Sequence, residues 1–165
     1  SVRGGMISVA EALDQLFELT APLGSETVSL LDANGRILAE DVHANRDQPP
    51  FDSSAMDGYA VSAAETGAVF SVIGEAAAGH RFNGIVGQGD AVRIFTGAPG
   101  PDGATQIVIQ EDVSRSGDQI TVTAELSENT HIRPSGGDFH VGDAVTAGRV
   151  LGPNDIALMA SMNIP

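Results

Sequence analysis

The chain between residues 49 and 138 consists of short apolar runs separated by segments rich in glycine and proline. The clearest run alternates Ile120 and Val122 with Thr121 and Thr123, which is the period-two pattern of a strand with one buried face. Four runs have strand character, namely AVFSVI (68–73), AVRIF (91–95), QIVIQEDV (106–113) and QITVTAEL (119–126). Because strands this short with frequent turns favour sheet over helix, this part of the chain is predicted to be a compact β domain.

Two segments inside this block predict turns rather than strands. The segment SRSGD, residues 114–118, lies between two strand-like runs and is typical of a hairpin connection. The segment GAPGPDGA, residues 97–104, holds too many turn formers to lie inside a strand.

The two ends of the chain have helical and mixed character. Residues 8–19 predict a helix, since Ser8 and Glu11 form a capping box and the apolar residues then fall on one face. A break and a short strand are expected within residues 21–31, followed by a short helix after Ser29 and a strand near residues 40–43. Residues 141–152 predict one more strand pair.

The last segment predicts a helix that starts at Pro153, where proline suits the first helical position. Asn163 suits the left-handed conformation that ends a helix. The expected class is therefore α+β and mostly β. Residues 49–138 are expected to form a β domain inserted into an elongated mixed α/β domain made by residues 6–48 and 139–165.

Charge excludes several classes of partner. The eight basic residues are all arginine, against 22 Asp and Glu, for a net charge of −14. Nucleic acid binding requires clustered cations, so it is not expected.

No apolar run reaches the roughly 18 residues that a membrane helix requires. Without a recognisable signal peptide, a cytoplasmic location is expected.

Familiar catalytic and metal motifs are also absent from the sequence. There is no cysteine, and no lysine to complete a phosphate-binding P-loop. The four histidines, His43, His80, His131 and His140, do not have the spacing of metal ligands.

Three polar segments are candidates for a functional site. They are PPFDSSAMDGYAV (49–61), RIFTGAPGPDGA (93–104) and HIRPSGGDFHVGD (131–143). Each segment, taken singly, also has the composition of an ordinary loop.

Taken in order, these segments closely resemble the amino-terminal half of the molybdopterin molybdotransferases. This is the MoeA family, which includes the E domain of gephyrin. The segments IVIQED (107–112) and GPNDIALMAS (152–161), and the opening ISVAEAL and LLDANGRILAEDV, fit the same family. The departures are Ser53 where the family usually has Asn, Gly100 where it has a bulkier residue, and Gly137 where it has Glu.

The resemblance implies a specific reaction. Family members insert molybdate into adenylylated molybdopterin and release AMP with the help of a divalent metal such as Mg²⁺. The matching catalytic positions are Asp57, Thr96 and Asp138, with substrate contacts at Ser54, Gly97 and Glu111. Asp57 and Asp138 are the implied metal ligands.

The resemblance also implies a homodimer whose site is shared between subunits, with a molybdopterin adenylyltransferase as its neighbour in the pathway. Family members continue past residue 165 into a domain that grips the pterin and its nucleotide. The 165-residue chain is therefore expected to be inactive without that domain.

Two other interpretations remain open at this point. The chain could be a non-catalytic module for dimerisation or scaffolding derived from the same family. An unrelated acidic β protein that binds Ca²⁺ has less support, because GGDFHVGD lacks the alternating Asp and Asn ligands of a calcium loop.

Overall fold

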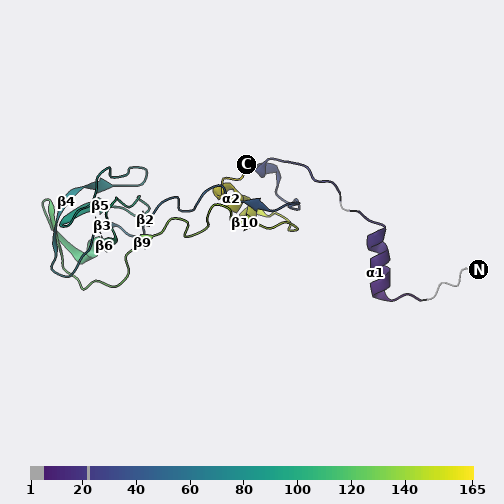
Figure 1. Cartoon of the computed structure of the whole chain (residues 1–165), viewed down its shortest axis with the longest axis horizontal. Coiled ribbons are helices and arrows are strands. Elements are labelled where there is room, and N and C mark those ends of the chain that lie inside the picture. The colour runs from purple at the N-terminus through teal and green to yellow at the C-terminus, as the bar shows by residue number, and fades with distance from the viewer. Residues whose placement is uncertain (1–5, 22) are drawn as a thin grey trace, which may run out of the picture.

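Six strands form the main sheet of the protein, in the order β6-β3-β5-β4-β8-β7. The computed structural model describes residues 6–21 and 23–165. The strands of this sheet are β3 (Gly58–Val61), β4 (Val69–Ala76), β5 (Asp90–Ile94), β6 (Gln106–Ile109), β7 (Val113–Ser116) and β8 (Gln119–Val122). Neighbouring strands are antiparallel except for the parallel pair β4 and β5. The protein is mostly β, with few helices, as predicted (Figure 1).

Both faces of the sheet are packed with small apolar side chains. One core contains Tyr59, Phe70, Val108, Ile120 and Val122. A second core contains Ala60, Val92, Ile94 and Ile107. Adjacent residues of β3, such as Tyr59 and Ala60, belong to different cores because successive side chains of a strand point to opposite faces.

Two further ladders lie outside this sheet. Strand β2 (Ser53–Ser54) pairs with β9 (Ile132–Arg133), and β1 (Val42–His43) pairs with β10 (Ala144–Val145). Both ladders are antiparallel and join segments that lie far apart in the sequence.

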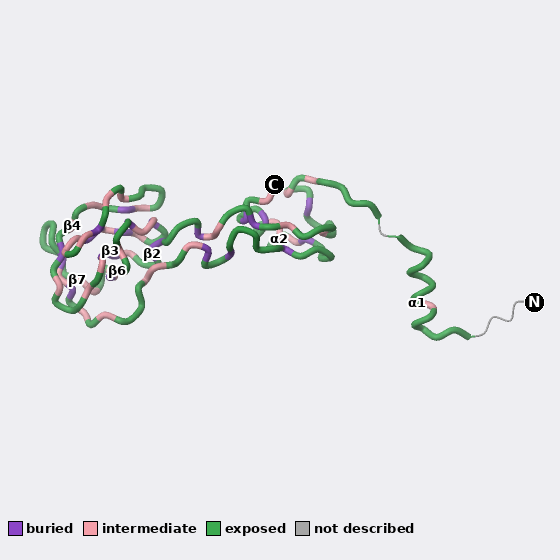
Figure 2. Tube along the Cα trace, in the orientation of Figure 1, coloured by how far each residue is buried: buried purple, intermediate pink, exposed green. Residues whose placement is uncertain are grey.

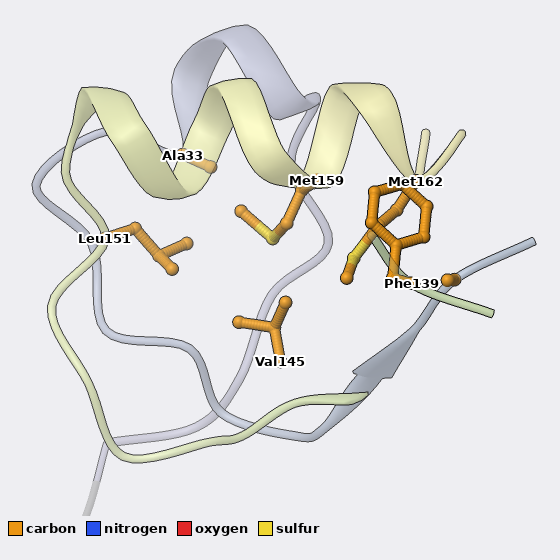
Figure 3. Close-up of a cluster of buried hydrophobic side chains, with 7 residues drawn as sticks. Ala33, Phe139, Val145, Leu151, Met159 and Met162 are labelled. Atoms are coloured by element: carbon orange, nitrogen blue, oxygen red, sulfur yellow. The ribbon is translucent and has the colours of Figure 1, made fainter. Parts of the chain in front are cut away.

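Segments from both halves of the chain build a separate core around helix α2 (Pro153–Ser161). Met159 points from the helix towards Val145 and Leu151, as Figure 3 shows, and Met162, which follows the helix, belongs to the same buried cluster. Ala33, Ala44 and Phe139 complete the buried set. This core contains no residue of the six-stranded sheet.

Helix α1 (Val9–Glu18) buries none of its residues. Ser8 and Glu11 make the predicted capping box, with the Glu11 backbone N–H donating to Ser8 Oγ at 3.2 Å and the Ser8 backbone N–H to Glu11 Oε2 at 2.7 Å. The helix lies apart from the other elements in Figure 1 and is exposed along its length in Figure 2. Its apolar face, Val9, Leu13, Leu16 and Phe17, is therefore open.

The predicted elements differ from the structure in four places. The strand-like run 106–113 is divided by the 3₁₀ turn η2 (Gln110–Asp112), so that β6 ends at Ile109 and β7 begins at Val113. The helix expected after Ser29 is a single 3₁₀ turn, η1 (Leu30–Asp32), because the Ser29 hydroxyl bonds the Asp32 carboxylate rather than a backbone N–H and Gly35 has a φ of 81°. The strand expected before it is absent from described residues 21 and 23–29. Of the pair expected in residues 141–152, only β10 forms, and its partner is β1.

No helix in the described ranges, residues 6–21 and 23–165, is long and apolar enough to cross a membrane.

Candidate active site

Asp57 lies directly before β3, at a point where the backbone presses closely against β6. A Cβ atom on Gly58 would lie 2.2 Å from the Val108 carbonyl oxygen, so a larger residue cannot follow Asp57 without displacing a strand. The Gln110 backbone N–H donates to the Asp57 carbonyl at 3.0 Å. These contacts hold the half-buried Asp57 at the rim of the sheet.

The antiparallel pairing of β3 and β5 brings Asp57 to Thr96. Gly58 at the start of β3 is opposite Ile94 at the end of β5, so the residues just outside these two positions are also neighbours. The Thr96 backbone N–H and hydroxyl donate to Asp57 Oδ1 at 2.8 and 2.7 Å. Within the described chain, Oδ2 of Asp57 accepts no hydrogen bond, which leaves it available to a ligand.

These hydrogen bonds lower the pKa of Asp57 below its ordinary value. The backbone N–H of Thr96 contributes most, its hydroxyl adds to the effect, and the positive charge of Arg93 contributes least. Limited burial of the carboxyl acts in the opposite direction. Asp57 is therefore ionised at neutral pH.

Gly97 directly follows Thr96, and Ser54 at the end of β2 lies beside it. The Gly97 backbone N–H donates to the Ser54 carbonyl at 2.8 Å, and Gly97 has a φ of 81°, which favours glycine. The Ser54 hydroxyl donates to the Met56 carbonyl at 2.6 Å. Ser54 is buried and so helps to hold the loop, while its expected contact with substrate stays a prediction.

Glu111 joins the group through its neighbour in the 3₁₀ turn η2 (Gln110–Asp112). The Gln110 side-chain amide donates to Glu111 Oε1 at 3.2 Å, and the Gln110 backbone bonds Asp57. Gln110 therefore contacts the backbone carbonyl of Asp57 and the carboxylate of Glu111.

Asp138 lies in a different part of the chain, beside the β2 and β9 ladder. Its carboxylate pairs with Arg133, and its backbone N–H donates to the Gln48 carbonyl at 2.8 Å. No hydrogen bond in the described chain joins Asp138 to Asp57 or Thr96. The structure therefore joins Asp57, Thr96, Gly97, Ser54 and Glu111 by direct or short links, and Asp138 is not part of that network.

Residues 6–21 and 23–165 contain no cluster of three or more His, Cys, Asp or Glu side chains that could hold a metal ion without other ligands. A metal held at this site would need further oxygen ligands from water, from a substrate or from another chain. Asp57 Oδ2 and Glu111 Oε2 are carboxylate oxygens that the network of described residues leaves open.

A cavity of about 330 Å³ lies beside β2 and is lined by residues that include Phe51, Ser53, Arg81, Pro99 and Ile132. Ser54 lines this cavity, whereas Asp57 and Thr96 do not. The Asp57 and Thr96 pair therefore lies on an open rim outside the cavity.

Arg93 and Gln110 are the residues that the sequence interpretation missed. Arg93 contacts the rings of Tyr59 and Phe95 and bonds both Gly58 and Gln110. The sequence signal was the arginine inside the apolar strand AVRIF, since a charged residue in such a position needs partners.

Comparison with known proteins assigns the family. The family model described as MoeA N-terminal region (domain I and II) matches residues 7–163. The chain belongs to the MoeA N-terminal family. A MoeA crystal structure from Pyrococcus horikoshii OT3 superposes with a TM-score of 0.86 at 32% identity, covering 97% of this chain and 45% of that one.

Curated MoeA relatives are considerably longer than this chain. A molybdopterin molybdenumtransferase of Haemophilus influenzae is 37% identical over 164 residues, which cover 96% of this chain and 41% of the relative. One from Staphylococcus aureus strain Mu50 is 34% identical over 163 residues, which cover 94% and 39%. The chain thus spans about two fifths of the relatives that it matches.

Proposed function

We propose that this MoeA region is the amino-terminal part of a molybdopterin molybdotransferase, which inserts molybdate into adenylylated molybdopterin and releases AMP. The observation that carries the proposal is the Asp57 carboxylate, which Thr96 holds by one oxygen while the other stays open. The names of the relatives and the match across residues 7–163 support the reaction class. An orientation fixed in advance suits catalysis because positioning of reacting groups lowers the barrier.

The donor chemistry at Asp57 fits a magnesium ion. Mg²⁺ is commonly held by one or two carboxylates together with substrate phosphates, and Asp57 Oδ2 is an open carboxylate oxygen. When bound, the metal would supply positive charge between the protein and its anionic substrates. We propose Asp57 as the first ligand. Asp138, whose carboxylate is paired with Arg133, would have to exchange that partner to become the second.

We propose that the positively charged residues that bind the anionic substrates lie outside this chain. Molybdate and the adenylylated pterin are anions, and the chain carries a net charge of −14. Four of its arginines already pair with carboxylates, namely Arg36, Arg81, Arg133 and Arg149. On this account the chain is inactive by itself, and the relatives' additional length provides the pterin and nucleotide site.

We further propose a homodimer in which Asp57 of one subunit faces the nucleotide site of the other. The open apolar face of α1 supports association with a second copy, because contiguous exposed apolar surface marks interaction sites. Leu16 and Phe17 expose 57% and 70% of their surface. A molybdopterin adenylyltransferase would supply the substrate, and the cytoplasm is the proposed location.

The proposed domain division follows the predicted one. Residues 49–138 would form the inserted β domain. Residues 6–48 and 139–165 would together form the mixed domain into which it is inserted. The separate core around α2 supports this division, since its buried residues all come from outside residues 49–138.

A scaffold module without chemistry is the second candidate, and the open face of α1 is compatible with it. A scaffold needs α1 but has no use for the Asp57 and Thr96 pair, so loss of function on changing Asp57 separates the two proposals.

The experiment uses the full-length protein that contains this region, with adenylylated molybdopterin as substrate and AMP release as the readout. We expect AMP release that depends on added molybdate. A folded dimer that binds the substrate but releases no more AMP with molybdate than without it would contradict the proposed function.

A further inference from the structure

We propose that Arg93 is a positioning residue, which locks the end of β5 to the turn that carries Asp57 and thereby aligns Asp57, Thr96 and Glu111. The effect on turnover rests on the proposed function, whereas the effect on local geometry does not.

Two aromatic rings hold the guanidinium group of Arg93 in place. Arg93 is opposite Tyr59 in the register of β3 and β5. Its Cζ atom lies 5.2 Å from the centroid of the Tyr59 ring and 4.6 Å from that of Phe95. Both distances are within the range of cation–π contact, so the side chain is held in one orientation rather than extended into water.

The orientation directs the guanidinium donors at the backbone next to Asp57. Nη1 donates to the Gly58 carbonyl at 3.0 Å, and Nη2 donates to Gln110 Oε1 at 2.7 Å. Arg93 therefore joins three strands, because Gly58 begins β3 and Gln110 follows β6. The rigid, planar geometry of arginine allows both bonds at once, which lysine cannot reproduce.

Gln110 extends this link to the backbone of Asp57 and to the carboxylate of Glu111. Its backbone N–H donates to the Asp57 carbonyl at 3.0 Å, and its side-chain amide donates to Glu111 Oε1 at 3.2 Å. Arg93 and Gln110 thus bond successive carbonyls, those of Gly58 and Asp57. The bond between the Arg93 guanidinium and the Gln110 side chain couples these two contacts, so the turn that carries Asp57 depends on it.

Arg93 lies in β5, three residues before Thr96, which is in the turn that follows this strand. Arg93 therefore connects the segment that donates the hydrogen bonds to Asp57 with the segment that accepts them. If this link is lost, Thr96 and Asp57 are joined only by their own contacts at the rim of the sheet. If Arg93 only stabilised the fold, its loss would instead destabilise the whole sheet to a similar extent, including strands that are distant from the site.

The test measures amide hydrogen exchange by NMR in the 165-residue chain. The variants are Arg93→Met, which keeps an apolar stem but loses both bonds, and Gln110→Leu, which leaves the ring contacts of Arg93 in place. We expect exchange of the Thr96 amide to rise at least about tenfold in both, because local opening exposes it. Exchange of the Val122 amide, which bonds the Ala68 carbonyl in the same sheet, should not change.

Arg81→Met is the matched control, because Arg81 is an exposed arginine whose single partner among the described residues is Asp102. It should leave Thr96 exchange as in the wild type. Unchanged Thr96 exchange in Gln110→Leu, or an equal rise at Thr96 and Val122, would overturn the proposal. Should Arg93→Met not fold, Gln110→Leu decides the question.

A second readout uses the full-length protein. If the wild type releases AMP on addition of molybdate, kcat of Arg93→Met should fall about a hundredfold with KM changed less than about threefold, as expected for misplaced groups. Unchanged kcat, or a loss confined to KM, would contradict positioning for catalysis. An inactive wild type would refute the proposed function, and hydrogen exchange would still decide the role of Arg93.

Discussion

Asp57 and Thr96 are joined by two hydrogen bonds to a single oxygen, with the Thr96 backbone N–H and hydroxyl 2.8 and 2.7 Å from Asp57 Oδ1. The acceptor is an ionised carboxylate, and such charge-assisted bonds are stronger than neutral ones. The pair gives Asp57 a fixed orientation and keeps it charged. Both properties are needed if the open Oδ2 is to contact a metal or a substrate.

Thr96→Val should raise the pKa of Asp57 while leaving it below the ordinary value. The substitution removes the hydroxyl donor, but the backbone N–H, which lowers the pKa most, remains. A carbon-detected NMR titration of the Asp57 carboxyl measures the change. Thr66→Val is the control and should not alter the titration, since the Thr66 hydroxyl donates to the Ala124 carbonyl, away from Asp57.

The same pair makes stability depend on pH with a defined sign. The pKa of Asp57 is lower in the folded chain than in the unfolded chain. The ionised carboxylate therefore stabilises the folded chain at pH values above its ordinary pKa, and this stabilisation is lost as the pH falls through the pKa of the folded chain. The free energies of unfolding of the wild type and of Thr96→Val should therefore differ most at neutral pH and become similar in acid. A difference that grows as the pH falls would contradict this assignment.

Gly58→Ala should destabilise the chain by about 3 kcal/mol, the upper part of the range for overpacking. The added Cβ would meet the Val108 carbonyl oxygen at 2.2 Å, and this neighbour is backbone rather than a flexible side chain. Urea unfolding monitored by circular dichroism measures the loss. Gly24→Ala, where nothing lies within 4 Å, is the control and should change the free energy of unfolding by less than about 0.5 kcal/mol.

Phe17→Asp should convert a dimer of the chain into a monomer that remains folded. The Phe17 side chain lies on the open face of α1 and contributes to no buried core. Sedimentation velocity measures the change in mass. Gln15→Asp adds the same charge to another part of the helix surface and should remain dimeric. A wild-type chain that is already monomeric would show that α1 does not join two copies of it.

The local elements of this protein were largely predictable from its sequence. The hairpin between β7 and β8 forms at the predicted glycine, and α2 begins at Pro153 and ends near Asn163, whose φ is 60°. Turns and caps depend on residues a few positions apart, so single-sequence patterns capture them. Ile120 and Val122 are buried, as their alternation with threonine indicates.

Strand order and most of the site contacts were not predictable in the same way. The parallel pairing of β4 with β5 joins residues such as Ser71 and Asp90 and depends on packing of the whole sheet. The resemblance of the MDGYA and FTGAP segments to MoeA identified Asp57 and Thr96 as site residues. That they bond each other follows from the register of β3 and β5, and the link through Arg93 and Gln110 needs three strands in place.

Mixed dimers should distinguish an active site that is shared between subunits from an active site that each subunit forms by itself. Full-length Asp57→Asn is mixed with a variant that is disabled only beyond the region described here, under conditions where subunit exchange is verified. If the site is built from two chains, one site in each heterodimer contains both intact halves, and part of the AMP release returns. Verified exchange without any recovery would contradict the shared site.

Molybdate-dependent AMP release by full-length Asp57→Asn tests the central claim most directly. Asn keeps the shape and can still accept from Thr96 through its carbonyl, so the melting temperature should change by only a few degrees. The negative charge is lost, and turnover should fall by about a hundredfold or more, as when a key electrostatic contact is removed. Asp102→Asn, an exposed carboxylate paired with Arg81, is the matched control and should retain full turnover. Normal AMP release by a folded Asp57→Asn protein would contradict the role assigned to this carboxylate.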